Sequence, residues 1–243
     1  LGAVMEKAGL CLSKAILSST EPGDFILLLA GKGNNGGDTR LASEQLRDRD
    51  VLLIAVTDPR DTFNILEQTL QRRPALIVDG LFGVGLNRDL NAAWVRLITL
   101  VNESESPVLS VDCPSGLEAD YGRVCGAAII AQTTLTFGAP KRGLISDESA
   151  KYVGALEVAT NIGLSEQLPE SDAFWLTESD MHWALPERSP ASHKGDYGHL
   201  AIISGSTGYH GAAVLSARSA LRARPGTHRA SDPRRFPPGR STF

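Results

Sequence analysis

Amide and carboxylate side chains fill an early glycine-rich stretch, which reads Gly31-Lys-Gly-Asn-Asn-Gly-Gly-Asp38. An apolar run precedes the stretch and a helical pattern follows it. This order of strand, loop and helix start points backbone N–H groups and a positive helix end at a phosphate. The spacing Gly31-x-Gly33-x-x-Gly36 satisfies the dinucleotide-binding fingerprint, and the Asn and Asp side chains add groups that can hold a sugar, a cation or a reacting hydroxyl. We therefore predict a nucleotide-phosphate loop, with a purely structural turn as the alternative.

Two further strand ends repeat this combination of an acidic residue and nearby glycines. Asp79 closes one apolar run before Gly80-Leu-Phe-Gly-Val-Gly-Leu86, and Asp112 closes the next before Cys113-Pro-Ser-Gly-Leu117. The carboxyl ends of parallel strands line the ligand crevice of an α/β sheet. We therefore expect six polar residues to converge on one site: Asn34, Asn35, Asp38, Asp79, Asp112 and Ser115.

Carboxylates buried at such an edge need partners, because an isolated buried charge is costly. Substrate hydroxyls, backbone amides or a bound cation could supply these partners. Donors that are all oxygen suit a hard cation better than zinc or copper. The alternative interpretation is that each Asp only caps the turn that follows it.

Apolar runs and helical patterns alternate along the first two thirds of the chain. Helices are predicted over residues 3–18, 36–49, 62–71 and 92–103, and strands over residues 25–30, 51–56, 75–79, 107–112, 133–137 and 155–159. The strand runs are continuously apolar, which indicates a parallel sheet that is covered on both faces. The predicted fold class is therefore α/β, with three layers and a mostly parallel sheet.

The composition argues against several classes of partner. The 243 residues are 42% hydrophobic and 21% charged, and the formal net charge of −4 gives no reason to expect nucleic acid or an anionic membrane as a partner. The longest apolar runs are strand-sized and too short to span a bilayer. Three cysteines without a CxxC pair favour free thiols in a reducing compartment, so we expect a cytoplasmic protein.

Five segments together resemble those of the YjeF N-terminal family, the NAD(P)H-hydrate epimerases. They occur in order over residues 1–165 and read Met5-Glu-Lys-Ala-Gly9, Gly31-Lys-Gly-Asn-Asn-Gly-Gly-Asp38, Val78-Asp-Gly-Leu-Phe-Gly-Val-Gly-Leu86, Val111-Asp-Cys-Pro-Ser-Gly-Leu117 and Thr136-Phe-Gly-Ala-Pro-Lys141. The resemblance implies a Rossmann-like α/β/α fold. It also implies an isomerase that interconverts the R and S epimers of hydrated NADH and NADPH in the repair of nicotinamide nucleotides.

The resemblance further implies a substrate site and a potassium site. The hydrated nucleotide is expected at two loops and one strand end, namely Asn34, Asn35, Gly36, Gly37, Asp38, Gly83, Val84, Gly85, Leu86, Asn87, Arg88, Asp89 and Asp112. A potassium ion is expected on Asn35, Asp79 and Ser115. These expectations are compatible with a homodimer.

The chemistry of the implied reaction indicates a catalytic residue. Epimerising a carbon that bears a hydroxyl beside a ring nitrogen needs only proton transfers, with reversible loss of water or ring opening. One carboxylate near the leaving oxygen can serve as acid and then as base. We hypothesise that Asp112 has this role, while the cation and Asn35 keep the site rigid and balance its charge.

Two residues depart from the family pattern. Thr39 stands where the family usually has Gly, and its side chain would strain the loop if that position needs a positive φ. Val84 replaces a common Thr and removes a hydroxyl from the substrate loop. Either change predicts a reduced activity.

A second resemblance begins at Ser192. The segment from His193 to Ala213 looks like the opening of the nucleotide-dependent NAD(P)H-hydrate dehydratase domain, which has a ribokinase-like fold. The similarity stops at residue 223, and one strand and one helix cannot form a core alone. We predict an epimerase domain over 1–165, a linker over 166–191, a truncated dehydratase start over 192–223 without dehydratase activity, and a disordered or aberrant tail over 224–243.

Two other functions stay open at this point. An NAD-dependent dehydrogenase is suggested by the fingerprint and by Asp58, about twenty residues beyond Gly36, although no catalytic Tyr-Lys or His-Asp pair follows. A noncatalytic binding module of the same fold is the third interpretation. Retention of Asp38, Asp79 and Asp112 argues against it, whereas Thr39 and the broken second domain argue for it.

Overall fold

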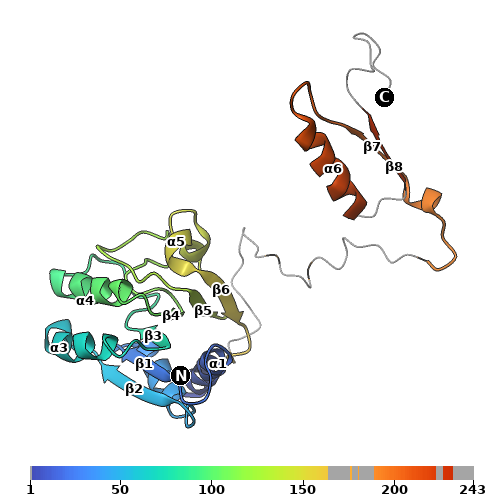
Figure 1. Ribbon diagram of the computed structural model, residues 1–243. Coiled ribbons are helices and arrows are strands. Elements are labelled where there is room, and N and C mark those ends of the chain that lie inside the picture. Colours follow the sequence, from blue (N-terminus) through green and yellow to red (C-terminus); the bar gives the residue numbers. More distant parts are fainter. Residues whose placement is uncertain (1, 164–175, 177–179, 181–188, 223–226, 232–243) are drawn as a thin grey trace. The chain divides into compact units, whose positions relative to one another are not determined.

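The chain folds into two compact units, Leu1–Ala173 and Phe174–Phe243 (Figure 1). The computed structural model describes residues 2–163, 176, 180, 189–222 and 227–231. Most of the predicted linker over 166–191 lies outside these described residues.

The first unit contains a six-stranded sheet in which every pair of neighbouring strands is parallel. Its strand order is β2-β1-β3-β4-β5-β6. The bounds are β1 Phe25–Ala30, β2 Asp50–Ala55, β3 Leu76–Gly80, β4 Val108–Val111, β5 Thr133–Phe137 and β6 Ala155–Ala159. The predicted α/β fold class is thus confirmed, and the sheet is wholly rather than mostly parallel.

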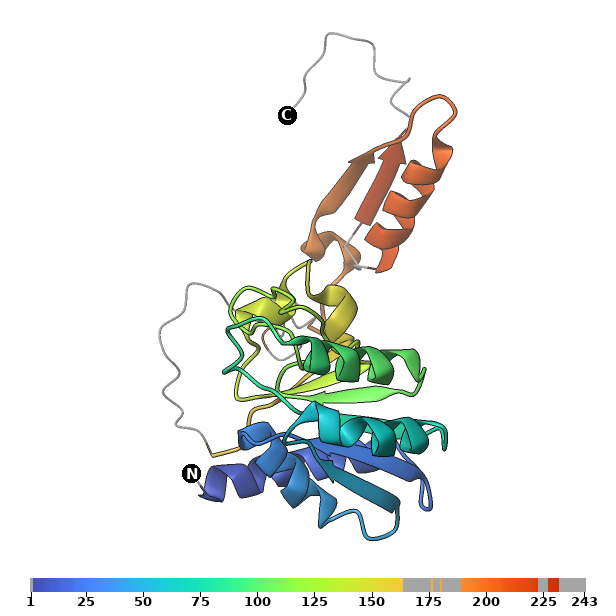
Figure 2. The same ribbon diagram turned by 90° about the vertical axis from the view of Figure 1, so that its left-hand side faces the viewer.

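Helices cover both faces of this sheet. Their bounds are α1 Gly2–Ser18, α2 Asn34–Ser43, α3 Pro59–Leu70 and α4 Ala92–Glu103. One buried cluster joins Ile26 and Leu28 of β1 to Leu12 of α1. A second cluster joins Leu27 and Leu29 of the same strand to α3 and α4, which face the viewer in Figure 2. Alternate residues of β1 therefore enter opposite cores, which explains why the whole strand is apolar.

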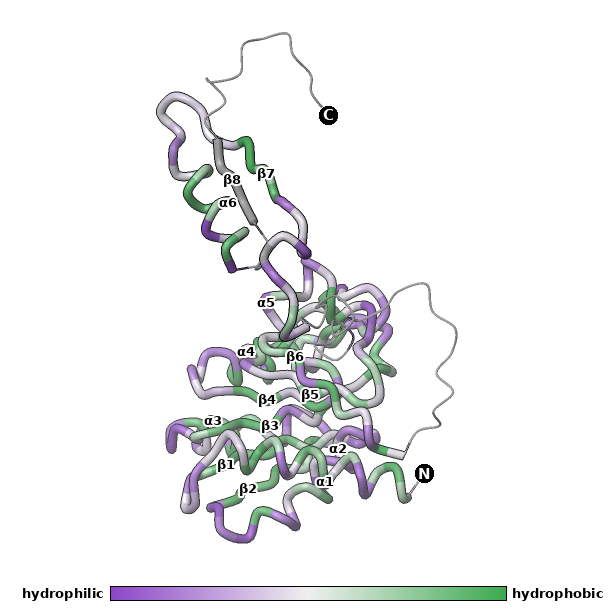
Figure 3. The backbone as a smooth tube through the Cα atoms, turned by 90° about the vertical axis from the view of Figure 1, so that its right-hand side faces the viewer, coloured by the Kyte–Doolittle hydropathy of each residue, from purple (hydrophilic) through white to green (hydrophobic). Residues whose placement is uncertain are grey.

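The backbone coloured by hydropathy shows the same layering (Figure 3). Apolar segments run along the strands of the sheet, and polar segments lie in many of the turns that connect them. A short 3-10 helix, η1 Arg142–Ile145, and helix α5 Ala150–Val153 lie between β5 and β6. Leu144 and Val153 from these elements join a third buried cluster that includes Cys113 and Leu117.

Two predicted helix boundaries are wrong for local reasons. Helix α3 begins at Pro59, three residues before the predicted start, because the Asp58 carboxylate caps it by accepting a hydrogen bond from the Arg60 N–H. Helix α2 begins at Asn34 and ends at Ser43 instead of spanning 36–49. The chain turns after Ser43, and the Arg49 guanidinium donates to the Thr20 carbonyl at the end of that turn.

The ends of β1 and β3 lie at the point where the strand order of the sheet reverses. Strand β1 lies between β2 and β3, with Ala30 beside Gly80 and Leu29 beside Asp79. Connections from β1 thus leave toward opposite edges of the sheet. A crevice opens at such a switch point in doubly wound folds, and ligands bind there. The fold therefore places the Gly31–Asp38 loop and the loop after Asp79 side by side at the expected ligand edge.

The second unit contains a parallel strand pair. Its elements are η3 Lys194–Tyr197, β7 His199–Ile203, α6 His210–Arg222 and β8 Thr227–Ser231, and β7 pairs with β8. The predicted disordered or aberrant tail over 224–243 contains strand β8, and residues 223–226 and 232–243 lie outside the described part. The predicted domain bounds stay a prediction. Residues 227–231 lack the continuous apolar run by which the other parallel strands are recognised, so the sequence pattern does not indicate this strand.

No helix in the described part of the chain is long and apolar enough to cross a lipid bilayer. All three cysteines, Cys11, Cys113 and Cys125, are free thiols, as the sequence predicts.

Candidate active site

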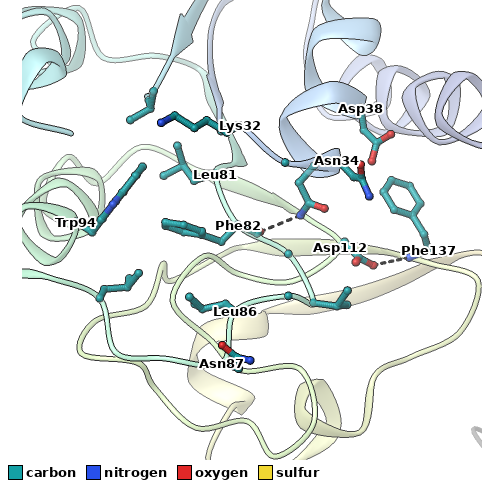
Figure 4. Close-up of a pocket in the computed structure, with 18 of the residues that line it drawn as sticks. Lys32, Asn34, Asp38, Leu81, Phe82, Leu86, Asn87, Trp94, Asp112 and Phe137 are labelled. Carbon is teal, nitrogen blue, oxygen red and sulfur yellow. Dashed lines mark hydrogen bonds between the residues drawn. The ribbon is translucent and has the colours of Figure 1, made fainter. Parts of the chain in front are cut away.

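A pocket of about 1030 Å³ opens at the carboxyl edge of the sheet in the first unit (Figure 4). Its walls come from the starts of α1, α2 and α4, the loops after β1, β2 and β3, the last residue of β5, and single residues that follow β4 and β6. The volume is at the upper end of the range for small-molecule sites. The pocket therefore lies where the sequence predicts it and has room for a large ligand.

Close backbone packing explains the glycines of the first loop. A Cβ on Gly36 would lie 1.9 Å from the Gly31 carbonyl oxygen, and a Cβ on Gly31 would lie 2.1 Å from the Leu81 carbonyl oxygen. Neither glycine has a positive φ. The loops after β1 and β3 thus approach each other as closely as backbones can, so these glycines are required by space.

This packing predicts a difference between two glycine substitutions. Gly36→Ala should destabilise the protein by about 1–3 kcal/mol, because its Cβ must push the Gly31 peptide aside. Gly33→Ala is the matched control, since its Cβ would meet nothing within 4 Å and its φ of −84° suits any residue. Urea denaturation of both variants tests the difference. Equal stabilities would contradict the close packing of Gly36 on the Gly31 peptide.

The Asn35 amide ties three segments of the site together. Its Nδ2 donates hydrogen bonds to the Phe82 carbonyl at 2.9 Å and to the Val111 carbonyl at 2.5 Å. Phe82 in turn donates its N–H to Ser115 Oγ at 2.9 Å. The buried amide thus fixes the loop after β3 and the end of β4 relative to helix α2, and its Oδ1 accepts no hydrogen bond from the described residues.

Asp79 lies beneath the pocket rather than in it. Its carboxylate is fully buried and accepts hydrogen bonds from Ser110 Oγ, from the Ser115 N–H and Oγ, and from the Leu81 N–H. Burial raises its pKa, and these hydrogen bonds oppose that rise. Asp79 and Ser115 thus lie next to the pocket lining and not in it. The role predicted for them as potassium ligands with Asn35 stays a prediction.

Asp112 faces the pocket from a strained backbone position. Its φ is +65°, in a region that Asp and Asn tolerate better than most residues. Its Oδ1 accepts hydrogen bonds from Thr136 Oγ1 and the Phe137 N–H, both at 3.2 Å, and forms an ion pair with Lys141 Nζ at 2.5 Å. All three donors bind one oxygen. Among the described residues nothing donates to Oδ2, which leaves that oxygen available to a ligand.

Asp38 enters the same end of the pocket from helix α2, as Figure 4 shows. It is only 6% exposed, and no described residue donates a hydrogen bond or forms an ion pair with its carboxylate. Burial, together with the nearby charge of Asp112, raises the pKa of Asp38 to about 7. Among the carboxyl groups of the pocket, those of Asp38 and Asp112 thus lie in unlike surroundings, one paired with a cation and one without.

The raised pKa of Asp38 predicts a pH dependence of stability. The ordinary pKa is 3.8, so between pH 3.8 and about 7 the native state binds a proton that the unfolded chain has released. Stability from this group therefore falls as the pH rises through that window. Asp38→Asn should remove this dependence, so that the variant gains stability relative to wild type from pH 5 to pH 8. Denaturation at pH 5 and at pH 8 measures the free energy of unfolding of both proteins. If the difference between the variant and wild type were the same at both pH values, the environment assigned to Asp38 would be contradicted.

A neighbouring thiol is excluded as a nucleophile. Burial, assisted by the charge of Asp112, raises the pKa of Cys113 to about 12. The group therefore stays a neutral thiol near pH 7, and the thiolate is the reactive form.

Comparison with known proteins identifies this arrangement. The profile described as "YjeF-related protein N-terminus" matches residues 1–64 and 53–143. The chain belongs to this family. The matched residues include the loop after β1, Asp79, Asp112 and Lys141, so they contain nearly all of the site.

Named relatives and a solved structure agree with the family assignment. The chain is 34% identical over 241 residues to the bifunctional NAD(P)H-hydrate repair enzyme Nnr of Coxiella burnetii, covering 90% of this chain and 49% of that enzyme. It is 33% identical over 178 residues to the NAD(P)H-hydrate epimerase of Limosilactobacillus fermentum, covering 66% and 86%. A crystal structure of the yeast protein YNL200c matches with a TM-score of 0.50 and 18% identity, over 70% of this chain and 86% of that one, which supports the fold. The chain spans about half the length of its bifunctional relatives.

Most residues predicted for a substrate site of this family line the pocket. These are Asn34, Asn35, Asp38, Gly83, Val84, Gly85, Leu86, Asn87, Arg88, Asp89 and Asp112. Gly36 and Gly37 do not line it, because they are the packed base of the loop. A Cβ on Gly37 would lie 2.9 Å from Met5 Sδ of helix α1.

Sequence reasoning missed several residues of the site. Lys141 lies in a family segment that by itself predicts no role for it, yet it forms the ion pair with Asp112. The apolar walls were not predicted either, since their residues come from elements far apart in the sequence: Val4, Met5, Trp94, Phe137 and Ile162. The family segments around Met5 and Lys141 were the signal that could have found two of them.

The two departures from the family pattern have different structural outcomes. Thr39 lies inside helix α2 without a positive φ, and its Oγ1 donates to the Asn35 carbonyl at 2.7 Å. The expected strain is therefore absent. Thr39 packs against Gly80, and a Cβ on Gly80 would lie 2.0 Å from Thr39 Oγ1. Val84 lines the pocket and is 55% exposed, and its effect on activity stays a prediction.

Proposed function

We propose that this protein is an isomerase that interconverts the R and S epimers of hydrated NADH and NADPH. The observation that carries the proposal is a single pocket in which Asp112 and Asp38 meet the two glycine-containing loops of the YjeF-related family. The names of the curated relatives, an NAD(P)H-hydrate epimerase and bifunctional repair enzymes, support this substrate. The free thiols support a reducing compartment, for which we propose the cytoplasm.

Each part of the pocket has a role in this proposal. The loop after β1 provides backbone N–H groups for the phosphates, because it leads directly into the start of helix α2. The loop over residues 83–89 closes the opposite wall over the nucleotide. Asp112 then moves protons at the hydroxyl-bearing carbon through Oδ2, while Lys141 and Thr136 hold Oδ1 in place.

A potassium ion is part of the proposal, held by Asn35, Asp79 and Ser115. These side chains offer only oxygen atoms for binding, which suits a hard cation. The buried Asp79 carboxylate forms no ion pair with a described residue, so a bound cation would balance its charge. The described residues also contain no group of three or more His, Cys, Asp or Glu side chains arranged to hold a metal. When bound, the ion would supply charge balance and rigidity to the base of the site.

The potassium site can be tested through stability. Wild type should melt at a higher temperature in potassium chloride than in tetramethylammonium chloride of equal ionic strength, because a ligand of the native state stabilises it. Ser115→Ala should lose this difference. A melting temperature that is the same in both salts would reject the cation site without reference to activity.

The structure weakens the dehydrogenase alternative. A dehydrogenase of this fold needs an acidic residue beyond the second strand, and Asp58 is the candidate. Its carboxylate instead caps helix α3 by accepting from the Arg60 N–H, and it forms an ion pair with Arg60. Its carboxylate is thus engaged at a helix start, away from a role in holding a ribose. The pocket lining also provides no Tyr-Lys or His-Asp pair for hydride transfer.

One assay separates the three functions. Purified protein is mixed with the R epimer of hydrated NADPH, and formation of the S epimer is followed by chromatography against an enzyme-free control. We expect accelerated exchange without change in the redox state of the ring. Hydride transfer to a carbonyl substrate would instead favour the dehydrogenase, and binding without exchange would favour the noncatalytic module.

A further inference from the structure

Inversion at the hydroxyl-bearing carbon needs protons on two sides of the ring. If the hydroxyl leaves as water from one face, a proton must reach its oxygen there. If water then adds from the other face, a proton must be removed on that side. A single carboxylate fixed to the protein cannot serve both faces unless the ring turns over within the pocket, so two groups suit the reaction better than one.

The pocket contains a second carboxyl group, that of Asp38, to which no residue in the described part of the chain binds. Asp38 is 6% exposed and lines the same cavity as Asp112. No described residue donates a hydrogen bond to it or forms an ion pair with it, whereas Asp79 accepts four hydrogen bonds within the protein. A buried polar group without a protein partner is costly unless a ligand or a proton satisfies it.

We propose that Asp38 is a second catalytic residue, which exchanges a proton with the substrate oxygen on the face opposite to the one that Asp112 serves. This inference rests on the proposed epimerase function and assigns the two proton transfers to two residues. The support is geometric: Asp38 comes from helix α2 and Asp112 from the end of β4, and both reach the same end of the pocket (Figure 4).

The surroundings of the two carboxyl groups decide their roles. Lys141 forms an ion pair with Asp112, so that carboxylate is the base. Asp38 has no such cation among the described residues; Phe137 at this end of the pocket is uncharged, and Asp112 is the charged group that acts on Asp38. Burial and that charge raise the pKa of Asp38 to about 7, so it carries a proton to donate near neutral pH.

The proposed steps balance in atoms and charge. Asp38 gives its proton to the hydroxyl oxygen, the C–O bond breaks, and the ring nitrogen's lone pair forms the C=N bond of an iminium ion as water leaves. Water then adds to the other face, the C=N electron pair returns to nitrogen, and Asp112 takes the proton. The product is the inverted alcohol. Proton exchange with solvent returns the pair to its starting state, and the reverse reaction exchanges the two roles.

Oxygen isotopes test the loss of water. The R epimer of hydrated NADPH is incubated with wild type in H₂¹⁸O, and mass spectrometry measures the label in the S epimer, corrected for an enzyme-free control. We expect one solvent oxygen in each S product. If the S epimer kept its original oxygen, the exchange would proceed by ring opening and not by loss of water. No hydroxyl would then leave, so no proton would be needed on it, and the proposal would be overturned.

A substitution tests the residue itself. Asp38→Asn should lower kcat by about 100-fold or more with little change in KM, since a lost proton transfer acts on the transition state. The matched control is Asp61→Asn, which makes the same chemical change at an exposed position of α3 and should keep the wild-type rate. A wild-type kcat in Asp38→Asn, or a loss confined to KM, would show that Asp38 only binds substrate.

The pH profile of wild type provides a readout that does not depend on folding of the variant. We expect kcat/KM to fall above about pH 7 as Asp38 of the free protein loses its proton. A flat profile up to pH 9 would overturn the assignment. Exchange by wild type together with a fully active Asp38→Asn rejects this inference alone, whereas absence of exchange in wild type rejects the proposed function as well.

Discussion

Asp112→Asn is expected to lower the rate of epimer exchange by about 10²–10⁴-fold while nucleotide binding stays measurable. Asparagine keeps the shape of the side chain and tolerates the positive φ of +65° at this position, so the backbone should not move. It cannot take a proton through Oδ2, and it loses the ion pair with Lys141. The measurement is single-turnover conversion of the R epimer, with binding followed separately by calorimetry.

Two controls sharpen this experiment. Asp120→Asn makes the same chemical change at an exposed residue outside the pocket and should exchange at the wild-type rate. The melting temperature of Asp112→Asn shows whether the unpaired Lys141 disturbs the fold. A folded Asp112→Asn protein with unchanged exchange would remove Asp112 from the mechanism, whatever its place in the pocket.

Asp79→Ala is expected to cost about 3 kcal/mol or more of the free energy of unfolding. The carboxylate is completely buried and accepts from the Ser110 hydroxyl and from both the N–H and the hydroxyl of Ser115. Its removal leaves these donors buried without an acceptor, and each such group costs about 1–3 kcal/mol. Urea denaturation, with the dependence on urea checked for a two-state transition, gives the value.

The matched control for Asp79→Ala is Asp50→Ala. Asp50 forms an ion pair with Arg72, and both side chains are more than half exposed. Exposed pairs contribute about 0–1 kcal/mol, so this variant should stay close to wild type. If both variants lost the same small amount of unfolding free energy, Asp79 would not be the buried structural support that its hydrogen bonds indicate.

The sequence was sufficient for the fold because the signals were strong and local. Strand β1, for example, is continuously apolar, which is the pattern typical of a strand with both faces buried. The glycines and acidic residues at the ends of β1, β3 and β4 then predicted the edge at which the pocket opens. Boundaries failed where single side chains decide them, as when Asp58 starts helix α3 earlier than the apolar pattern suggests.

The site was harder to predict because partners come from distant segments. A sequence shows that Asp79 and Asp112 both end strands. It does not show that Ser110 and Ser115 donate hydrogen bonds to the Asp79 carboxylate, which holds that carboxylate outside the pocket lining. Lys141 lies 29 residues from Asp112 and reaches it only because β5 lies beside β4. Likewise the unlike surroundings of Asp38 and Asp112 depend on burial, which no spacing of residues encodes.

The most direct test of this account is a crystal structure of the protein with hydrated NADPH. The hydroxyl-bearing carbon should lie between the carboxyl groups of Asp38 and Asp112, with its oxygen about 3 Å from one of them. An adenine ring at that end of the pocket, or a nucleotide bound elsewhere on the chain, would contradict the proposed reaction.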